Sequence, residues 1–98
     1  MRAVVTGSAS GIGKATVERL TADGYDVIGW DLSADVPVDV SSAESVAAAC
    51  ERIDGTLDAV VLAAGVSRMA RLTETTDDDW HFQMNVNTYG VFNCLRAL

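Results

Sequence analysis

Three glycines near the start of the chain have the spacing and the setting of a phosphate-binding turn. Gly7, Gly11 and Gly13 follow the apolar run 3–5, and a helical pattern begins directly after them. Glycine has no Cβ, so backbone N–H groups can approach phosphate oxygens closely, and a helix N-terminus adds partial positive charge. In such a turn the first glycine allows the sharp bend, the second the approach to the phosphates, and the third close packing of the helix. The sequence therefore predicts a turn that binds the pyrophosphate of a dinucleotide.

An acidic residue stands where a dinucleotide-binding turn requires one. Residues 26–30 predict a second strand, and Asp31 follows at its carboxyl end, 18 positions after Gly13. The general pattern has an acid about 20 residues further on, which accepts hydrogen bonds from the ribose hydroxyls. A carboxylate repels the 2′-phosphate of NADP, and Ser10 and Leu32 occupy the positions where a compensating cation would stand. The sequence therefore favours NAD over NADP as the cofactor.

Two other interpretations of the glycine turn have to be weighed. A glycine-rich turn that binds nothing stays open, because a glycine triplet alone is weak evidence. A phosphate-binding NTPase is rejected by the spacing. Its motif needs Ser or Thr directly after the lysine and an earlier glycine, and here Ala15 follows Lys14 and Ser8 stands at the glycine position.

The spacing of the glycines also resembles that of a known family. The motif Thr6-Gly7-x-x-x-Gly11-Ile12-Gly13 is similar to the cofactor motif of the short-chain dehydrogenases/reductases. Three further segments resemble the same family in the same order. They are Asp39-Val40, similar to an adenine-binding pair, Ala63-Ala64-Gly65, similar to Asn-Asn-Ala-Gly at a strand end, and Asn85 to Phe92, similar to the central helix.

The resemblance implies an NAD-dependent oxidoreductase that transfers hydride between a nicotinamide and a small-molecule secondary alcohol or ketone. It implies cofactor contacts from Gly7, Ser10, Gly11, Ile12, Gly13, Asp31, Leu32, Asp39, Val40, Ala63, Ala64 and Gly65. It also places Asn87 in the catalytic tetrad, where it would hold the helix geometry and a water of the proton relay. On composition alone, the preferred interpretation of Asn87 is a helix asparagine bonded to a neighbouring backbone group.

Two departures from the family pattern limit what the resemblance implies. Leu62 and Ala63 replace the two asparagines expected before Ala64, so the side-chain amides that would brace this strand end are missing. The family's catalytic serine and its Tyr-x-x-x-Lys pair lie beyond the central helix, and the printed chain ends at Leu98 within a helical pattern. We therefore expect the amino-terminal half of an enzyme, inactive by itself. The alternative function is a non-catalytic nucleotide-binding or assembly module.

The order of the expected elements predicts an α/β fold. We expect a Rossmann-type doubly wound parallel sheet with the early strands ordered 3-2-1-4, truncated after the central helix. Residues 1–98 should form a single unit, the amino-terminal portion of a dinucleotide-binding domain. The second to fourth strands are expected at residues 26–30, 36–38 and 57–63, and capping signals are expected at Ser41-x-x-Glu44 and Thr76-x-x-Asp79.

Composition and charge argue against several classes of partner. Of the 98 residues, 49% are hydrophobic, and the apolar runs are strand-sized, so no membrane association is expected. A net charge of −7 makes nucleic acid a poor partner. The first strand begins at Ala3, which leaves no room for a signal peptide, so a cytoplasmic location is expected.

The remaining reactive side chains predict no metal site. Cys50 and Cys94 are too few and too far apart for a disulfide framework or a metal motif, and we expect buried, reduced thiols. His81 has no ligand-type neighbours in metal-binding spacing. Residues 66–75 fit either a substrate-contacting segment or a solvated connection. The resemblance, finally, implies a homo-oligomer.

Overall fold

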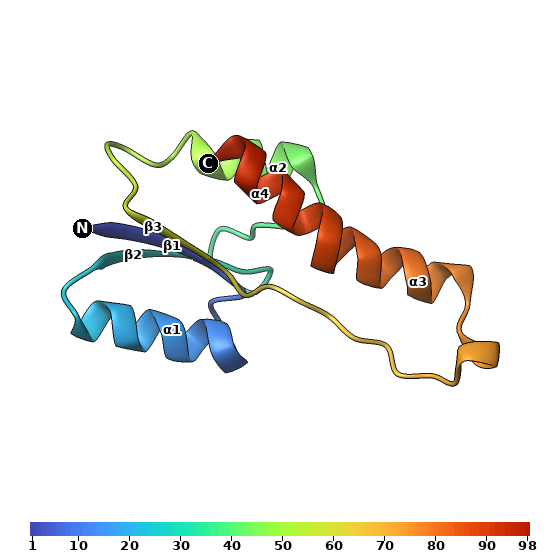
Figure 1. Ribbon diagram of the computed structural model, residues 1–98. Coiled ribbons are helices and arrows are strands. Elements are labelled where there is room, and N and C mark those ends of the chain that lie inside the picture. Colours follow the sequence, from blue (N-terminus) through green and yellow to red (C-terminus); the bar gives the residue numbers. More distant parts are fainter.

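The computed structural model describes residues 1–98 and contains one sheet of three parallel strands. β1 (Arg2–Thr6) lies in the centre, between β2 (Asp26–Trp30) and β3 (Ala59–Leu62), as Figure 1 shows. The last four residues of β1 are buried, which fits a strand that has neighbours at both edges and helices over both faces. The carboxyl ends of the three strands therefore lie at one edge of the sheet.

The predicted strand at residues 36–38 is wrong, so the predicted order 3-2-1-4 lacks its first member, while the rest of that order, 2-1-4, is confirmed. The observed order is β2-β1-β3, and β3 is the strand that the sequence predicts as the fourth. Pro37 has no N–H to donate to a strand ladder. The N–H of Val38 donates instead to the carbonyl oxygen of Asp31 (3.1 Å). The chain between β2 and the next helix is therefore a loop, and the outer edge of β2 is unpaired.

Helices cover both faces of the sheet (Figure 1). α1 (Gly11–Ala22) packs on one face, and α2 (Ala43–Cys50) and α4 (Gly90–Ala97) lie together over the other. α1 ends where the sequence predicts, with Asp23 as its C-cap and Gly24 at a φ of 89°. This left-handed conformation is one that glycine adopts without steric cost.

A long helical segment brings the chain back over the sheet after β3. A short 3-10 turn (Leu72–Glu74) precedes α3 (Asp77–Met84), which runs through a π turn (Asn85–Tyr89) into α4 (Figure 1). The predicted cap of α3 is confirmed. Thr76 Oγ1 accepts a hydrogen bond from the Asp79 N–H (3.1 Å), and Asp79 Oδ2 accepts one from the Thr76 N–H (3.2 Å).

The predicted cap of α2 is wrong by one residue. Ser42, not Ser41, is the N-cap, and its hydroxyl accepts a hydrogen bond from the Ser45 N–H (3.2 Å). The Ser41 hydroxyl donates to the carboxylate of Asp39 instead (2.6 Å). The side chain of Ser41 is thus engaged in the turn before the helix rather than in the cap.

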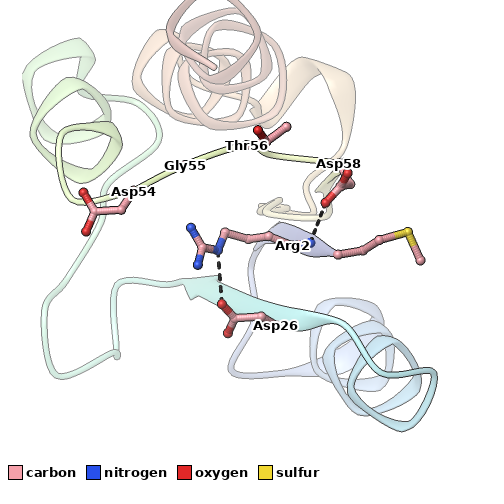
Figure 2. Close-up of a pocket in the computed structure, with 7 residues that line it drawn as sticks. Arg2, Asp26, Asp54, Gly55, Thr56 and Asp58 are labelled. Carbon is pink, nitrogen blue, oxygen red and sulfur yellow. Dashed lines mark hydrogen bonds and ion pairs between the residues drawn. The ribbon is translucent and has the colours of Figure 1, made fainter.

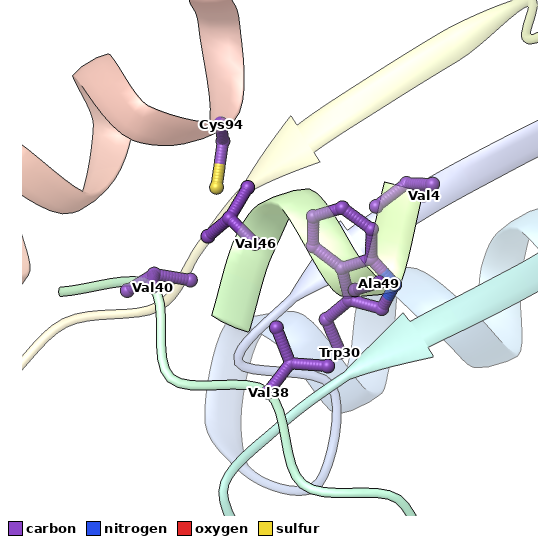
Figure 3. Packing of buried hydrophobic residues seen from close by; sticks show 7 residues of the cluster. All are labelled: Val4, Trp30, Val38, Val40, Val46, Ala49 and Cys94. Atoms are coloured by element: carbon purple, nitrogen blue, oxygen red, sulfur yellow. The ribbon is translucent and has the colours of Figure 1, made fainter. Parts of the chain in front are cut away.

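The hydrophobic core lies between the sheet and the pair formed by α2 and α4 (Figure 3). Its buried members are Val4, Trp30, Val38, Val40, Val46, Ala49 and Cys94. In α4, Leu95 is 63% exposed, while Asn93 and Cys94 are buried. A π turn holds one residue more than an α turn, so it rotates the following residues by about 100° around the helix axis.

Candidate functional site

The glycine turn joins the carboxyl end of β1 to α1, and two structural reasons require its glycines. Gly7 and Gly11 have positive φ angles of 67° and 54°. These angles lie in the left-handed region that favours glycine. A Cβ on Gly13 would overlap with the carbonyl oxygen of Gly7, whereas a Cβ on Gly11 would meet nothing within 4 Å. Gly13 therefore lets the start of α1 lie against the turn itself.

Backbone donors at the start of α1 are open to solvent. The first N–H groups of a helix have no partner within that helix. Ser10 is the N-cap and its side chain makes no capping hydrogen bond, while Ile12 is 79% exposed. Such donors, beside glycines without a Cβ, are the groups that bind phosphate oxygens. The turn therefore fits a pyrophosphate, with residues 10–13 nearest to it.

Asp31 is hydrogen-bonded to the glycine turn. One carboxylate oxygen accepts a hydrogen bond from the Ala9 N–H (3.1 Å), and the other accepts from the N–H (3.0 Å) and hydroxyl (2.9 Å) of Ser33. These bonds, the Ser33 N–H first among them, lower the pKa of Asp31 below its ordinary value of 3.8. Asp31 is therefore ionised at neutral pH, and its oxygens keep lone pairs for further donors. Leu32, beside it, is 67% exposed.

The end of β3 packs directly on the same turn. The Thr6 hydroxyl accepts a hydrogen bond from the Ala64 N–H (3.1 Å), and a Cβ on Gly7 would lie 2.9 Å from the backbone of Ala64. Ala63 and Ala64 are half-buried here, and Gly65 is exposed. The sequence lacks the asparagine side chains expected at this strand end, and in the structure the Thr6 hydroxyl braces it.

Asn87 holds the backbone just beyond Gly65. Its Oδ1 accepts a hydrogen bond from the Val66 N–H and its Nδ2 donates one to the Val66 carbonyl oxygen, both at 2.8 Å. A Cβ on Gly65 would lie 3.3 Å from Asn87 Oδ1. Asn87 belongs to the π turn, and a π turn inside a helix is frequent at functional sites. The side chain of Asn87 therefore hydrogen-bonds to backbone groups, as expected from composition. These groups belong to a distant segment of the chain and not to its own helix.

Asp39 shapes a short turn between β2 and α2. Its carboxylate accepts hydrogen bonds from the N–H (3.0 Å) and hydroxyl (2.6 Å) of Ser41, and its own N–H donates to the Ser45 hydroxyl (2.9 Å). No hydrogen bond joins its side chain to the glycine turn. The backbone bond from Val38 to Asp31 brings this turn toward the edge where the β2 strand ends.

One polar residue near this turn escaped the sequence prediction. Asn93 is 1% exposed, and its Nδ2 donates a hydrogen bond to the carbonyl oxygen of Val40 (2.9 Å). The available signal was an asparagine placed three residues after Gly90 and next to the apolar Cys94. The π turn rotates Asn93 around the helix axis, so counting 3.6 residues per turn does not place it on the buried face.

Residues 66–75 leave the site and reach α3 along a segment anchored by Arg68. The guanidinium lies 3.4 Å from a carboxylate oxygen of Asp79 and 3.8 Å from the ring centroid of Phe82. The N–H of Thr76 is the main group that lowers the pKa of Asp79, and Arg68 lowers it further. Beyond Arg68 the segment is open to solvent, with Met69 97% exposed.

A separate hollow of about 420 Å³ lies at the opposite, amino end of the strands. In Figure 2 the side chain of Arg2 lies in its middle, among the carboxylates of Asp26, Asp54 and Asp58. Arg2 Nε pairs with Asp26 (3.1 Å), and the Arg2 N–H donates to Asp58 (2.7 Å). Because ligands of open α/β sheets bind outside the carboxyl ends, we assign these bonds to tying β1 to its neighbours.

The structure shows no metal cluster and no membrane-spanning helix. No group of three or more His, Cys, Asp or Glu side chains is placed to hold a metal ion. None of the helices combines the length and the apolar character needed to cross a membrane.

The fold and the site together define a class of protein. A parallel α/β sheet with a glycine turn at the end of its central strand, and an acid at the end of the next, is the arrangement of dinucleotide-binding Rossmann-type chains. Residues 7–98 match the family model described as enoyl-(acyl carrier protein) reductase. The chain belongs to the short-chain dehydrogenase/reductase family, as its motifs indicate.

Individual relatives agree with this assignment. The chain is 32% identical to a short-chain dehydrogenase/reductase of Hericium erinaceus and 36% identical to the 2,3-dihydro-2,3-dihydroxybenzoate dehydrogenase of Escherichia coli. These alignments cover 96% and 94% of this chain, but 47% and 42% of the relatives. The X-ray structure of an alcohol dehydrogenase from Thermococcus sibiricus, complexed with 5-hydroxy-NADP, superposes with a TM-score of 0.93 at 31% identity, over 98% of this chain and 50% of that one. The chain thus spans about half the length of its relatives and corresponds to roughly their N-terminal half.

Proposed function

We propose that this chain is the cofactor-binding part of an NAD(H)-dependent oxidoreductase. The proposed reaction of the whole protein is hydride transfer between a nicotinamide and a secondary alcohol or ketone. The observation that best supports this proposal is the hydrogen bond from the Ala9 N–H to Asp31. It puts an ionised acceptor for ribose hydroxyls beside a turn that fits a pyrophosphate. Two of the relatives are named as dehydrogenases, which supports the same reaction class.

Each group at the carboxyl edge of the sheet has a proposed role. The backbone around Gly7, Ser10, Gly11, Ile12 and Gly13 would hold the pyrophosphate, and Asp31, with Leu32 beside it, the ribose next to the adenine. Asp39 and Val40 would border the adenine, and Ala63, Ala64 and Gly65 would offer backbone contacts. Asn87 would keep Val66 in place and hold a water of the proton relay.

We propose further that NAD is preferred over NADP. The Thermococcus sibiricus structure is a complex with 5-hydroxy-NADP, so a preference must come from this chain's own residues. Asp31 is ionised and would repel a 2′-phosphate, and the exposed neighbour Leu32 offers it no positive charge.

Binding of the two cofactors to one variant tests both proposals. The replacement Asp31→Ser removes the charge and keeps a small acceptor, so the Kd for NAD should rise roughly tenfold to a hundredfold. The Kd for NADP should stay or fall. Asp35→Asn, an exposed carboxylate in the same loop, is the matched control and should change neither value. The NAD preference would be overturned if the unchanged chain bound NAD and NADP with equal affinity and the Asp31→Ser replacement changed neither Kd.

Turnover is proposed for the whole protein and not for these 98 residues alone. The catalytic serine and Tyr-x-x-x-Lys of the family are not among them. We therefore expect the chain to bind NADH, seen by fluorescence titration, without oxidising any of a panel of secondary alcohols. Measurable turnover by the purified chain would contradict this expectation.

A nucleotide-binding or assembly module is the second candidate. One observation favours it: β3 pairs only with β1, so its outer edge offers unpaired backbone groups to another strand. If NAD binds only after a second polypeptide is added, the assembly role is favoured over the enzyme.

We also propose that the whole protein forms a homo-oligomer through α3, the π turn and α4. Large apolar side chains on this helical segment are exposed, Trp80 by 55%, Phe92 by 53% and Leu95 by 63%. Apolar area of this kind marks contact surfaces in soluble proteins. Sedimentation velocity of the unchanged protein and of Phe92→Asp tests this proposal, and a monomer in both samples would refute it.

A further inference from the structure

Asn93 is a buried amide in α4 whose hydrogen-bonding groups are both used. The side chain is 1% exposed, its Nδ2 donates to the carbonyl oxygen of Val40 (2.9 Å), and its Oδ1 accepts from Arg96 Nη2 (2.8 Å). Because the guanidinium can only donate, it fixes the amide so that Nδ2 faces Val40. Arg96 therefore determines the orientation of the Asn93 side chain.

An amide at this position is not what packing would select. Asn93 lies next to Cys94, whose thiol points toward Val46 in the apolar core (Figure 3). Burying a polar side chain is unfavourable unless its groups find partners, and an apolar side chain of similar size would fill the same space. What an apolar residue cannot do is satisfy the Val40 carbonyl group. The Asn93 amide thus supplies the hydrogen-bond donor that the buried Val40 carbonyl oxygen needs.

A second residue of α4 is adapted to the same turn. Gly90 is buried one helical turn before Asn93, and a Cβ there would lie 2.7 Å from Cγ2 of Val40. On its other side the turn is held by Asp39, whose carboxylate binds Ser41. Val40 is thus contacted by two residues of α4. The π turn directly before α4 carries Asn87, which binds Val66.

We propose that Asn93 is a positioning residue that holds the Asp39-Val40 turn, and with it the adenine end of the bound cofactor. This inference rests on the proposed function, in which Asp39 and Val40 border the adenine. It assigns two positioning tasks at the site to the continuous segment of the π turn and α4: Asn87 in the π turn holds Val66 beyond β3, and Asn93 in α4 holds the Asp39-Val40 turn. Loss of the Asn93 contact should weaken binding of the adenine half of the cofactor and leave binding of the nicotinamide half unchanged.

The test compares AMP, nicotinamide mononucleotide and NAD on Asn93→Leu. Leucine has the same number of side-chain heavy atoms and removes both hydrogen bonds, so the Kd values for AMP and NAD should rise about tenfold, while that for nicotinamide mononucleotide stays the same. Titrations followed by NMR can measure weak binding of the separate halves. Amide hydrogen exchange at residues 39–41 of the ligand-free protein should become faster in the same variant.

Two further variants guard against a purely structural effect. Ile53→Ala removes apolar volume beyond the far end of α2, and it should lower stability without changing the ratio of the AMP and nicotinamide mononucleotide affinities. Gly90→Ala should push Val40 from the same helix and reproduce the selective loss of AMP binding, which decides the question if Asn93→Leu does not fold.

Each outcome supports or overturns the inference. Unchanged AMP affinity in folded Asn93→Leu, or in Gly90→Ala where Asn93→Leu does not fold, overturns the role of Asn93 and leaves the proposed function intact. An equal loss for both halves also overturns it, because the effect is then general. A folded, unchanged chain that binds neither AMP nor NAD overturns the proposed function, and the inference falls with it.

Discussion

The side-chain amide of Asn87 makes both of its hydrogen bonds to the backbone of one residue, Val66. The N–H of Val66 donates to Oδ1 and its carbonyl oxygen accepts from Nδ2, each at 2.8 Å. The contact joins the π turn to the segment that leaves β3, 21 residues away in the chain. Only a primary amide offers a donor and an acceptor side by side, so no charged or apolar side chain can replace it here.

Replacement of Asn87 by Asp should therefore release Val66. The carboxylate keeps the acceptor but turns a second acceptor toward the Val66 carbonyl oxygen, so the free energy of unfolding should fall by about 1–3 kcal/mol. Urea denaturation measures this change. Asn85→Ala, in the same π turn and exposed, is the control and should stay within about 0.5 kcal/mol of the unchanged protein. An equal loss of stability in both variants would contradict the stabilising role of the hydrogen bonds between Asn87 and Val66.

Alanine at Gly13 and at Gly11 should act through different causes. At Gly13 the added Cβ overlaps with the Gly7 carbonyl oxygen, so the turn must move; we expect a loss of about 3 kcal/mol or more and no NAD binding. At Gly11 space is free and only the left-handed backbone is strained, which costs about 1–2 kcal/mol. Thermal unfolding and NAD titration of the two variants distinguish these causes. A larger loss at Gly11 would contradict the assignment.

The parts of the fold that local sequence patterns determine could be predicted. The glycine turn, the end of α1 at Asp23-Gly24 and the cap formed by Thr76 and Asp79 depend on residues within a few positions of one another. Residues 36–38 could not be predicted correctly, because an apolar, β-branched run suggests a strand even where Pro37 denies it a donor. Whether such a run pairs depends on a neighbouring strand that local sequence does not describe.

The long-range contacts of the site lay outside sequence reasoning for a related reason. The hydrogen bonds from the Ala64 N–H to the Thr6 hydroxyl and from the Asn93 amide to the Val40 carbonyl oxygen join residues 58 and 53 positions apart. Asn93 was hidden in addition by the π turn, since a count of 3.6 residues per turn assigns it to the wrong face. Sequence reasoning therefore located the glycine turn and the strand that follows it, and the side chains that hold these segments together became visible only in the structure.

The hydrogen bonds of Asp31 should make stability depend on pH. Because its pKa in the folded state is below the ordinary 3.8, the folded state favours the carboxylate. This contribution is present above the pKa of the unfolded chain and is lost as the pH falls through the lower pKa of the folded state. The difference in unfolding free energy between the unchanged protein and Asp31→Asn should therefore shrink between about pH 5 and pH 2. A difference that is constant over this range would contradict the assignment.

The cap of α3 should control the helix locally. In Thr76→Ala the Asp79 N–H loses its acceptor, which typically costs about 1 kcal/mol of helix stability. None of the α3 residues is buried, so we expect faster amide exchange at residues 77–80 and little change in global unfolding. Thr73→Ala, in the 3-10 turn just before, is the control. Unchanged exchange in Thr76→Ala would show that the cap does not hold the helix.

The two thiols should differ in reactivity. Burial, with a smaller contribution from Cys50, raises the pKa of Cys94 to about 11, and burial also raises the pKa of Cys50. Because alkylation requires the thiolate, iodoacetamide near neutral pH should modify half-buried Cys50 first and leave Cys94 unmodified in the folded protein. In denaturant both should react at the same rate, which mass spectrometry can follow. Faster modification of Cys94 than of Cys50 in the folded protein would refute its place in the core.

The raised pKa of Cys94 also makes stability depend on pH. The buried thiol contributes fully to stability below its ordinary pKa of 9.0, and this contribution is lost as the pH rises through about 11.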